Sequence, residues 1–333
     1  MNNKKQLWIR GAVIGVLALA VLAGALILLQ KEDDAHYSEK RGTMSENFGQ
    51  LKTVEWNGQT WREKPAVTTL LIAGIDKPDA QEQTGRYRGG GQADFLMLLA
   101  IDRTDKQIHQ LQIDRDTMTD VQILGVFGNE VGTRVLQICL AHSYGGSKQD
   151  NARYTVNAVQ NLLDGMEIDG YYIVDYSAVP LLNDALGGVK VHLDYDMTSV
   201  NPAWTKGSDI TLHGKDAETF VRSRMTVGAG TNEERMVRQN EFMHNAIDIM
   251  NKKISADLNF GEVMLNTLSD IAVTNLSRKR LLEELNTAYN FTILPVDHPA
   301  GTYSIGADGF MEFHMQEGAA VEWVLNHLYT KVE

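Results

Sequence analysis

Two apolar stretches decide the fold of this chain: residues 68–75 read TTLLIAGI, and residues 95–101 read FLMLLAI. Each has the length and the continuous apolar character of a strand that is buried on both faces. Residues 107–113 read QIHQLQI, and this alternation of polar with apolar side chains is typical of a third strand. These segments predict that the folded domain begins with three strands.

Helical and strand patterns alternate in the rest of the chain. Residues 133–163 show helical spacing, most clearly at Ala152, Val156, Val159 and Leu163. The other expected elements are helices over residues 177–186, 214–221, 232–250 and 316–329, two more helices in the last third, and strands over residues 171–174, 189–193 and 291–296. Strands that alternate with helices indicate an α/β sheet with helices packed on its faces.

Residues 11–29 carry no charged side chain and have the length of a helix that crosses a bilayer core. Lys4, Lys5 and Arg10 precede this run without an acid, so the positive-inside rule predicts a cytoplasmic N-terminus. The alternative is a cleaved signal peptide, but the apolar run continues past the small residues 23–25 to position 29, which favours an uncleaved anchor.

The expected layout is therefore that of a single-pass protein of the cell membrane. Residues 1–10 are predicted to be cytoplasmic and residues 11–29 to be the transmembrane helix. Residues 30–66 are predicted to be an extracytoplasmic linker, because they are polar and show no sustained pattern. Residues 67–333 are predicted to form one large extracellular domain.

Charge and cysteine content exclude several classes of function. The formal charge of −12 argues against a nucleic acid partner, which requires a basic face. The single cysteine, Cys139, cannot form an intramolecular disulfide, and its apolar neighbours Val135 and Ile138 indicate buried packing rather than catalysis. The long connection over residues 194–209 is expected to run over the surface or to form a lip of a site.

Aspartates stand at the ends of the first two expected strands. Asp76 follows the first strand, and Asp94 precedes the second. Ligands collect at strand ends in open α/β sheets, and Mg²⁺ is typically bound by one or two carboxylates together with substrate phosphate. The alternative for each residue is an aspartate that caps a turn. The chain has no G-x-S-x-G, P-loop or H-E-x-x-H motif, so serine and histidine chemistry are not expected.

Arginines gather in three further segments. Arg115 stands between two aspartates in IDRDT, residues 113–117, which fits either a local ion pair or a site. Four arginines and a glutamine follow within eighteen positions and are predicted to converge: Arg222, Arg224, Arg235, Arg238 and Gln239. Guanidinium groups suit bidentate contacts to phosphate, so this cluster favours a pyrophosphate ligand.

The order and spacing of these motifs resemble the LytR-CpsA-Psr family across residues 68–250. The most specific parts are IDRDT, then DALGGV, and then VRSR followed by ERMVRQ. The resemblance implies a mixed central β-sheet flanked by helices, an α-β-α sandwich. It also implies a phosphotransferase that moves a glycopolymer, such as teichoic acid or capsule, from a polyprenyl pyrophosphate carrier to peptidoglycan in Gram-positive-type cells.

The resemblance implies roles for individual residues. Asp76 and Asp94 are expected at a Mg²⁺ site and, with Arg115, Asp116 and Arg238, in catalysis. The residues expected to contact the pyrophosphate are Arg115, Arg222, Arg224, Arg235, Arg238 and Gln239. The alternatives to a transferase are a binder or regulator of lipid-linked pyrophosphate precursors and a lipid pyrophosphatase.

The chain departs from the family pattern at three positions. Pro78 and Gln92 stand where the family usually has arginines, and Asn232 stands where it tends to have an aspartate. Arg86 and Arg88 are candidates to replace the missing arginines. Because an amide cannot take up a proton as a carboxylate does, Glu233, Glu234 or Asp116 is expected to serve in place of residue 232.

Overall fold

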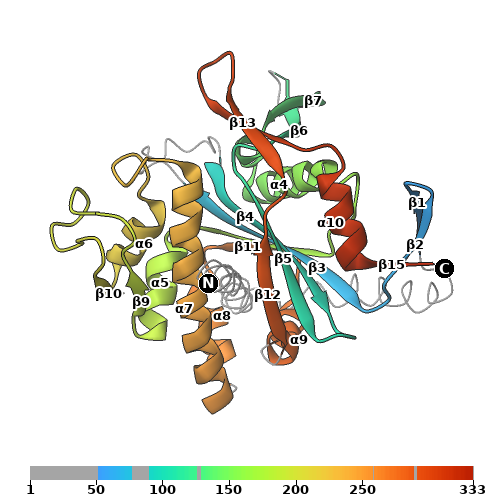
Figure 1. Ribbon diagram of the computed structural model, residues 1–333. Coiled ribbons are helices and arrows are strands. Elements are labelled where there is room, and N and C mark those ends of the chain that lie inside the picture. The colour runs from blue at the N-terminus through green and yellow to red at the C-terminus, as the bar shows by residue number, and fades with distance from the viewer. Residues whose placement is uncertain (1–51, 77–89, 126–128, 258, 289–290, 333) are drawn as a thin grey trace, which may run out of the picture.

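A six-stranded mixed sheet forms the centre of the molecule (Figure 1). The computed structural model describes residues 52–76, 90–125, 129–257, 259–288 and 291–332. The strands of the central sheet, in spatial order, are β11 (Ala272–Thr274), β8 (Gly170–Asp175), β3 (Val67–Asp76), β4 (Gln92–Asp102), β5 (Gln107–Ile113) and β12 (Thr292–Asp297).

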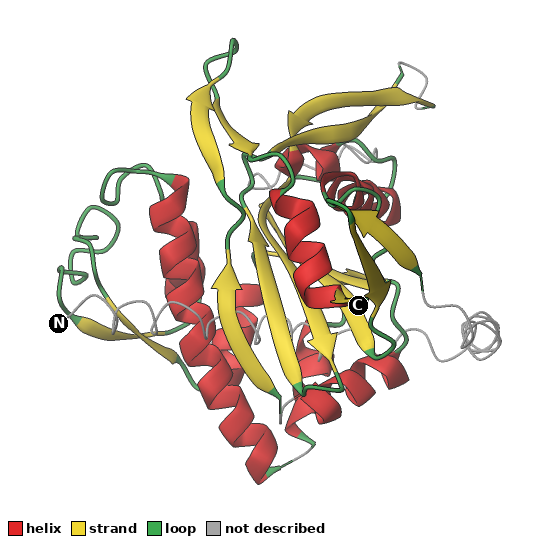
Figure 2. Cartoon of the chain, turned by 45° about the vertical axis from the view of Figure 1, so that its right-hand side comes forward, coloured by secondary structure: helices red, strands yellow, loops and turns green. Residues whose placement is uncertain are grey.

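The central strands are apolar throughout because helices cover both faces of the sheet. Along β3, Leu70 and Ile72 point into one core, while Leu71 and Ala73 point into the other. The first core lies under α5 (Ala178–Leu186), α6 (Lys215–Arg222), α7 (Asn232–Ala256), α8 (Phe260–Leu268) and α9 (Arg278–Ala288). The second lies under α4 (Lys148–Leu162), the 3₁₀ helix η1 (Ile138–Ser143) and α10 (Ala319–Leu328), so the predicted three-layer arrangement is confirmed (Figure 2).

The strand directions bring the polar strand ends to one edge of the sheet. β3 runs parallel to β8 and antiparallel to β4, and β5 runs antiparallel to β4. The end of β3, the start of β4 and the end of β5 therefore meet at the same edge. This edge, called the polar edge below, carries Asp76, Asp94 and the segment 114–116.

The expected elements of the central layers are confirmed with small shifts at their ends. α5 ends at Leu186, and Gly187 follows with φ of 91°, the left-handed conformation that favours glycine. β9 (Val189–His192) comes next and pairs with β10 (Asp209–Leu212). The connection between them folds back, since Trp204 is buried with its ring edge-on to Phe220.

Residues 133–147 contradict the predicted helical pattern. They continue β7 (Glu130–Gln137), which pairs with β6 (Met118–Leu124), and then form η1; the regular helix α4 begins only at Lys148. Most of β7 is exposed, so no core selects an alternation of polar and apolar residues along it. A second two-stranded ribbon, β13 (Gly301–Ile305) with β14 (Met311–Met315), stands beside the first in Figure 1.

The end of the predicted linker is ordered. β1 (Thr53–Trp56) and β2 (Gln59–Glu63) form a hairpin, and β15 (Tyr329–Lys331) pairs with β2. The pairing partner comes from the other end of the chain, so no local pattern announces it. Residues 11–29, the predicted anchor, lie outside the described residues, and in the described part no helix is both long and apolar enough to span a bilayer.

Gly91 sets the distance between β3 and β4 at the polar edge. Its φ is 80°, and a Cβ there would lie 2.3 Å from the backbone oxygen of Asp76. Gly91→Ala is expected to destabilise the protein by about 3 kcal/mol, because both the positive φ and the backbone clash disfavour the methyl group. Urea unfolding measures this change.

Gly58→Ala is the matched control. Gly58 also has a positive φ, 71°, but a Cβ there meets nothing within 4 Å. Gly58→Ala is expected to lower the free energy of unfolding by only about 1 kcal/mol. Equal losses in the two variants would contradict the close approach at Gly91.

Candidate functional site: an arginine and aspartate cluster at the strand ends

Asp94 is the centre of the polar edge. It is the extra residue of a β-bulge in β4, since Gly74 pairs with Phe95 and Ile75 pairs with Ala93. A bulge redirects a side chain, and here it points the carboxylate to the edge of the sheet. Asp94 is only 6% exposed, and a buried carboxylate requires charged or hydrogen-bonded partners.

Two arginines supply these partners. Arg115, in the turn after β5, donates to Asp94 Oδ1, and Arg235 Nη1 donates to Oδ2 at 2.7 Å. Arg235 lies in the first turn of α7, whose start is fixed by Thr231 accepting a hydrogen bond from the Glu234 backbone N–H. Arg115 Nη2 donates to Gln92 Oε1 at 2.5 Å and to the Cys139 sulfur at 3.1 Å.

Gln92 and Cys139 therefore form the support of Arg115. Gln92, which stands where the family usually has an arginine, orients Arg115 by accepting a hydrogen bond from its Nη2 atom. Burial raises the pKa of the Cys139 thiol to about 12, so the predicted role in packing is confirmed and a nucleophilic role is not supported.

Asp76 is held by an arginine from another element. The chain leaves α6 directly after Arg222, and this guanidinium binds Asp76 Oδ1 and Glu218 and lies 5.6 Å from the centre of the Tyr176 ring. Burial raises the pKa of the Asp76 carboxyl; Arg222 opposes the rise, and the carboxylate of Asp94 adds to it. The two aspartates are thus close enough to repel each other.

Arg238 and Gln239 face the backbone. Arg238 donates to the carbonyl oxygens of Phe220, Ser223 and Glu234, and burial lowers its pKa to about 10. Gln239 Nε2 donates to the Val221 carbonyl oxygen. These two residues fix the end of α6, which presents Arg222.

Arg224 differs from the other arginines. Its Nε donates to the Gly230 carbonyl oxygen at 3.1 Å. Its terminal nitrogens have no hydrogen-bond partner among the residues that the structure describes, so they are available to an anion.

Asp116 lies beside Arg115 with its Oδ1 atom 3.2 Å from Arg115 Nε. Burial raises the pKa of the Asp116 carboxyl, and the neighbouring Asp114 adds to the rise. Its Oδ2 atom is buried and accepts no hydrogen bond within the described part of the chain.

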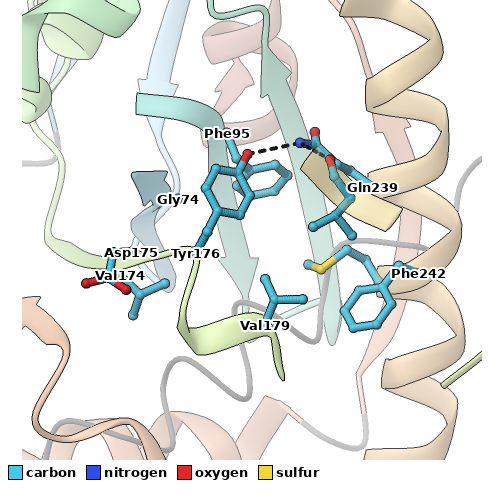
Figure 3. A pocket seen from close by; sticks show the side chains of 10 residues that line it. Gly74, Phe95, Val174, Asp175, Tyr176, Val179, Gln239 and Phe242 are labelled. Carbon is cyan, nitrogen blue, oxygen red and sulfur yellow. Dashed lines mark hydrogen bonds between the residues drawn. The ribbon is translucent and has the colours of Figure 1, made fainter. Parts of the chain in front are cut away.

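A small apolar pocket adjoins the cluster (Figure 3). Tyr176 and Gln239 stand at its polar side, where Gln239 Nε2 donates to the Tyr176 hydroxyl at 3.1 Å. The other lining residues are Gly74, Phe95, Val174, Asp175, Val179, Val221, Phe242 and Met243. The sequence could not distinguish these side chains from ordinary core residues.

Comparison with known proteins places the chain in a family. A model described as the LytR_cpsA_psr family matches residues 26–303. The chain belongs to this family. The polyisoprenyl-teichoic acid–peptidoglycan teichoic acid transferase TagU of Bacillus anthracis is 24% identical over 342 residues, covering 100% of this chain and 99% of TagU. TagU of Halalkalibacterium halodurans is 26% identical over 225 residues, covering 66% of this chain and 64% of the relative.

Solved structures of the LytR_cpsA_psr fold superpose on the chain. Bacillus subtilis TagV has a TM-score of 0.57 and 22% identity, with 80% of this chain and 98% of TagV covered. TagT bound to LI-WTA has a TM-score of 0.58 and 22% identity, with 79% of this chain and 91% of TagT covered. These similarities confirm the predicted mixed sheet flanked by helices.

The family resemblance implied Mg²⁺ at Asp76 and Asp94, and their donor chemistry fits this ion. The Asp94 carboxylate contributes to the raised pKa of Asp76, and a cation beside the two carboxylates would offset their repulsion. Mg²⁺ commonly takes one or two protein carboxylates and completes its shell with water and phosphate oxygens. No cluster of three or more Asp, Glu, His or Cys side chains suited to a metal occurs among the described residues.

Arg86 and Arg88, the candidates to replace the missing arginines, lie outside the described residues. Pro78, one of the departures from the family pattern, also lies outside them. Two residues of the site were missed by the sequence interpretation. Asp114 and Tyr303 are joined by a hydrogen bond of 2.5 Å across 189 positions. Tyr303 lies beyond the motifs, so no spacing pointed to it.

The raised pKa of Asp116 predicts a pH-dependent effect on stability. The pKa of Asp116 in the folded protein lies above its unfolded value of 3.8. Above the folded pKa the ionised carboxylate therefore lowers the free energy of unfolding. This destabilisation is lost as the pH falls through the folded pKa to 3.8. Asp116→Asn is expected to raise the unfolding free energy at pH 7 by about 1 kcal/mol. The gain is expected to shrink toward pH 4.

Urea unfolding between pH 4 and pH 8 measures this difference. Asp120→Asn is the control, because it makes the same change at an exposed position of β6. A gain for Asp116→Asn that did not change with pH would contradict the burial of an ionised carboxylate.

Proposed function

We propose that the chain is a phosphotransferase that moves a glycopolymer from a polyprenyl pyrophosphate carrier to a peptidoglycan hydroxyl. One observation carries the proposal: arginines from three segments meet two carboxylates at the mouth of an apolar pocket. Such a site suits a molecule with a pyrophosphate group next to a hydrocarbon chain. The curated relatives, whose names describe teichoic acid transferases, support the same activity.

The arginines would bind the pyrophosphate and stabilise the charge that develops on it. Arg222 and Arg224 flank the end of α6, and the terminal nitrogens of Arg224 have no hydrogen-bond partner among the described residues. Arg115 and Arg235 are preorganised by Asp94, so little reorganisation is needed when the substrate binds. Mg²⁺ held by Asp76 and Asp94 would neutralise additional phosphate charge.

Asp116 is the proposed general base. The acceptor hydroxyl oxygen attacks the phosphorus that bears the glycopolymer, and the bond to the bridging oxygen breaks. Polyprenyl phosphate leaves, and the hydroxyl proton passes to Asp116 Oδ2. A raised pKa suits this role, as does an oxygen that accepts no hydrogen bond from the described residues.

Residues 11–29 are proposed to anchor the domain on the outer side of the cell membrane. The carrier lipid is confined to the same bilayer, so an anchor raises the effective concentration of enzyme and substrate. The apolar pocket would hold the first part of the lipid beside the arginines.

The proposal predicts Mg²⁺-dependent transfer by the full-length chain in detergent. The assay combines a labelled polyprenyl-pyrophosphate saccharide with peptidoglycan oligosaccharides, and measures both the labelled oligosaccharide and the released polyprenyl phosphate. Arg115→Ala and Asp116→Asn are each expected to lower kcat about 100- to 1,000-fold. EDTA is expected to abolish turnover.

Arg278→Ala is the matched control, because it removes a surface ion pair with Glu262 and leaves the site intact. It is expected to keep about the parent rate. Release of polyprenyl phosphate at the same rate without acceptor would indicate a pyrophosphatase. Binding without turnover in any divalent metal would indicate a precursor-binding protein.

A further inference from the structure

Asp114 is buried beside the proposed site, but the proposed mechanism does not use it. Its side chain is 5% exposed and accepts three hydrogen bonds. The Asp116 backbone N–H donates at 2.8 Å, Asn232 Nδ2 at 3.0 Å and the Tyr303 hydroxyl at 2.5 Å. A carboxylate whose oxygens accept three hydrogen bonds is fixed in place.

Asn232 connects Asp114 to the arginines. Its Nδ2 faces Asp114, and its Oδ1 accepts from Arg235 Nη2 at 2.6 Å. The orientation of the amide follows from its partners, since a carboxylate only accepts and a guanidinium only donates. A side chain with both a donor and an acceptor is therefore required at this buried position.

Arg235 completes the connection. One end of its guanidinium is held by Asn232, and the other binds Asp94 Oδ2. A hydrogen-bonded series thus runs from Tyr303 through Asp114, Asn232 and Arg235 to Asp94. Asp114, Asn232 and Arg235 are each paired on both sides, so a change at Tyr303 is transmitted toward Asp94.

We propose that Asp114 is a positioning residue: through Asn232 it holds Arg235 on Asp94, and Tyr303 holds Asp114. The inference rests on the proposed function, because it assigns these residues to a pyrophosphate site. It also explains the amide at position 232. A carboxylate there would lie about 3 Å from Asp114 and would repel it.

An exchange of the two side chains tests the proposal. Asp114→Asn leaves two amides in contact, and Asn232→Asp places two carboxylates in contact. The double variant restores one acid and one amide in the opposite order. Each single variant is expected to weaken the binding of geranyl pyrophosphate and to lower kcat about tenfold, and the double variant to recover to within about threefold of the parent.

Two further variants separate positioning from general damage. Tyr303→Phe removes one donor at the surface and is expected to lower kcat about threefold without loss of folding. Asn245→Asp makes the same charge change on α7 at a partly exposed position, where the amide donates to the Lys190 carbonyl oxygen, and is expected to keep about the parent kcat.

The same double-mutant cycle is measured by urea unfolding, in which no substrate takes part. Parent-like single variants, or a double variant whose loss equals the product of the two single losses, would overturn the positioning role. A parent chain that binds no geranyl pyrophosphate would instead overturn the proposed function. In that case coupling in the unfolding cycle still decides whether Asp114 and Asn232 act as a pair.

Discussion

The buried carboxylate of Asp94 is the constraint on which the polar edge depends. A buried charge is tolerated only when an opposite charge or hydrogen bonds compensate it. Removing one member of a buried ion pair typically lowers the free energy of unfolding by about 3–5 kcal/mol. Arg115 and Arg235 come from the end of β5 and the start of α7, so one carboxylate fixes the sheet relative to the longest helix. The bulge in β4, the support from Gln92 and the Asn232 bridge all serve this geometry. The cluster therefore joins the sheet to α7, and it is also the proposed anion site.

The layers of the fold could be predicted because their patterns have a local physical cause. Strands such as β3 and β4 are buried on both faces and read as continuous apolar runs, and glycine at position 187 marks the end of α5. The exposed strands β7 and β13 gave no such signal, since little of their surface is selected for burial. Residues 53–63 were expected to be linker because their partner, β15, is at the far end of the chain.

The site could be predicted in its composition but not in its connections. The spacing of Arg222, Arg235 and Arg238 indicated a cluster, yet it could not show that Arg238 donates to backbone carbonyls. Nor could it show that the terminal nitrogens of Arg224 lack a hydrogen-bond partner in the described part of the chain. The departure at Asn232 was visible in the sequence, and Glu233, Glu234 and Asp116 were the expected substitutes. The residue in contact with Asn232 is Asp114. This contact depends on how β5 meets α7, and no pattern within either segment encodes it.

The bond between Tyr303 and Asp114 also has a consequence for the timing of biosynthesis. A chain is made from its N-terminus, so the arginines and aspartates exist well before the β13–β14 hairpin that carries Tyr303. Until that hairpin has been made and docked, Asp114 lacks one of its three donors. A nascent or truncated chain therefore holds the cluster incompletely. That hairpin is followed in the chain by α10 and β15, so the complete arrangement of the cluster requires almost the whole domain.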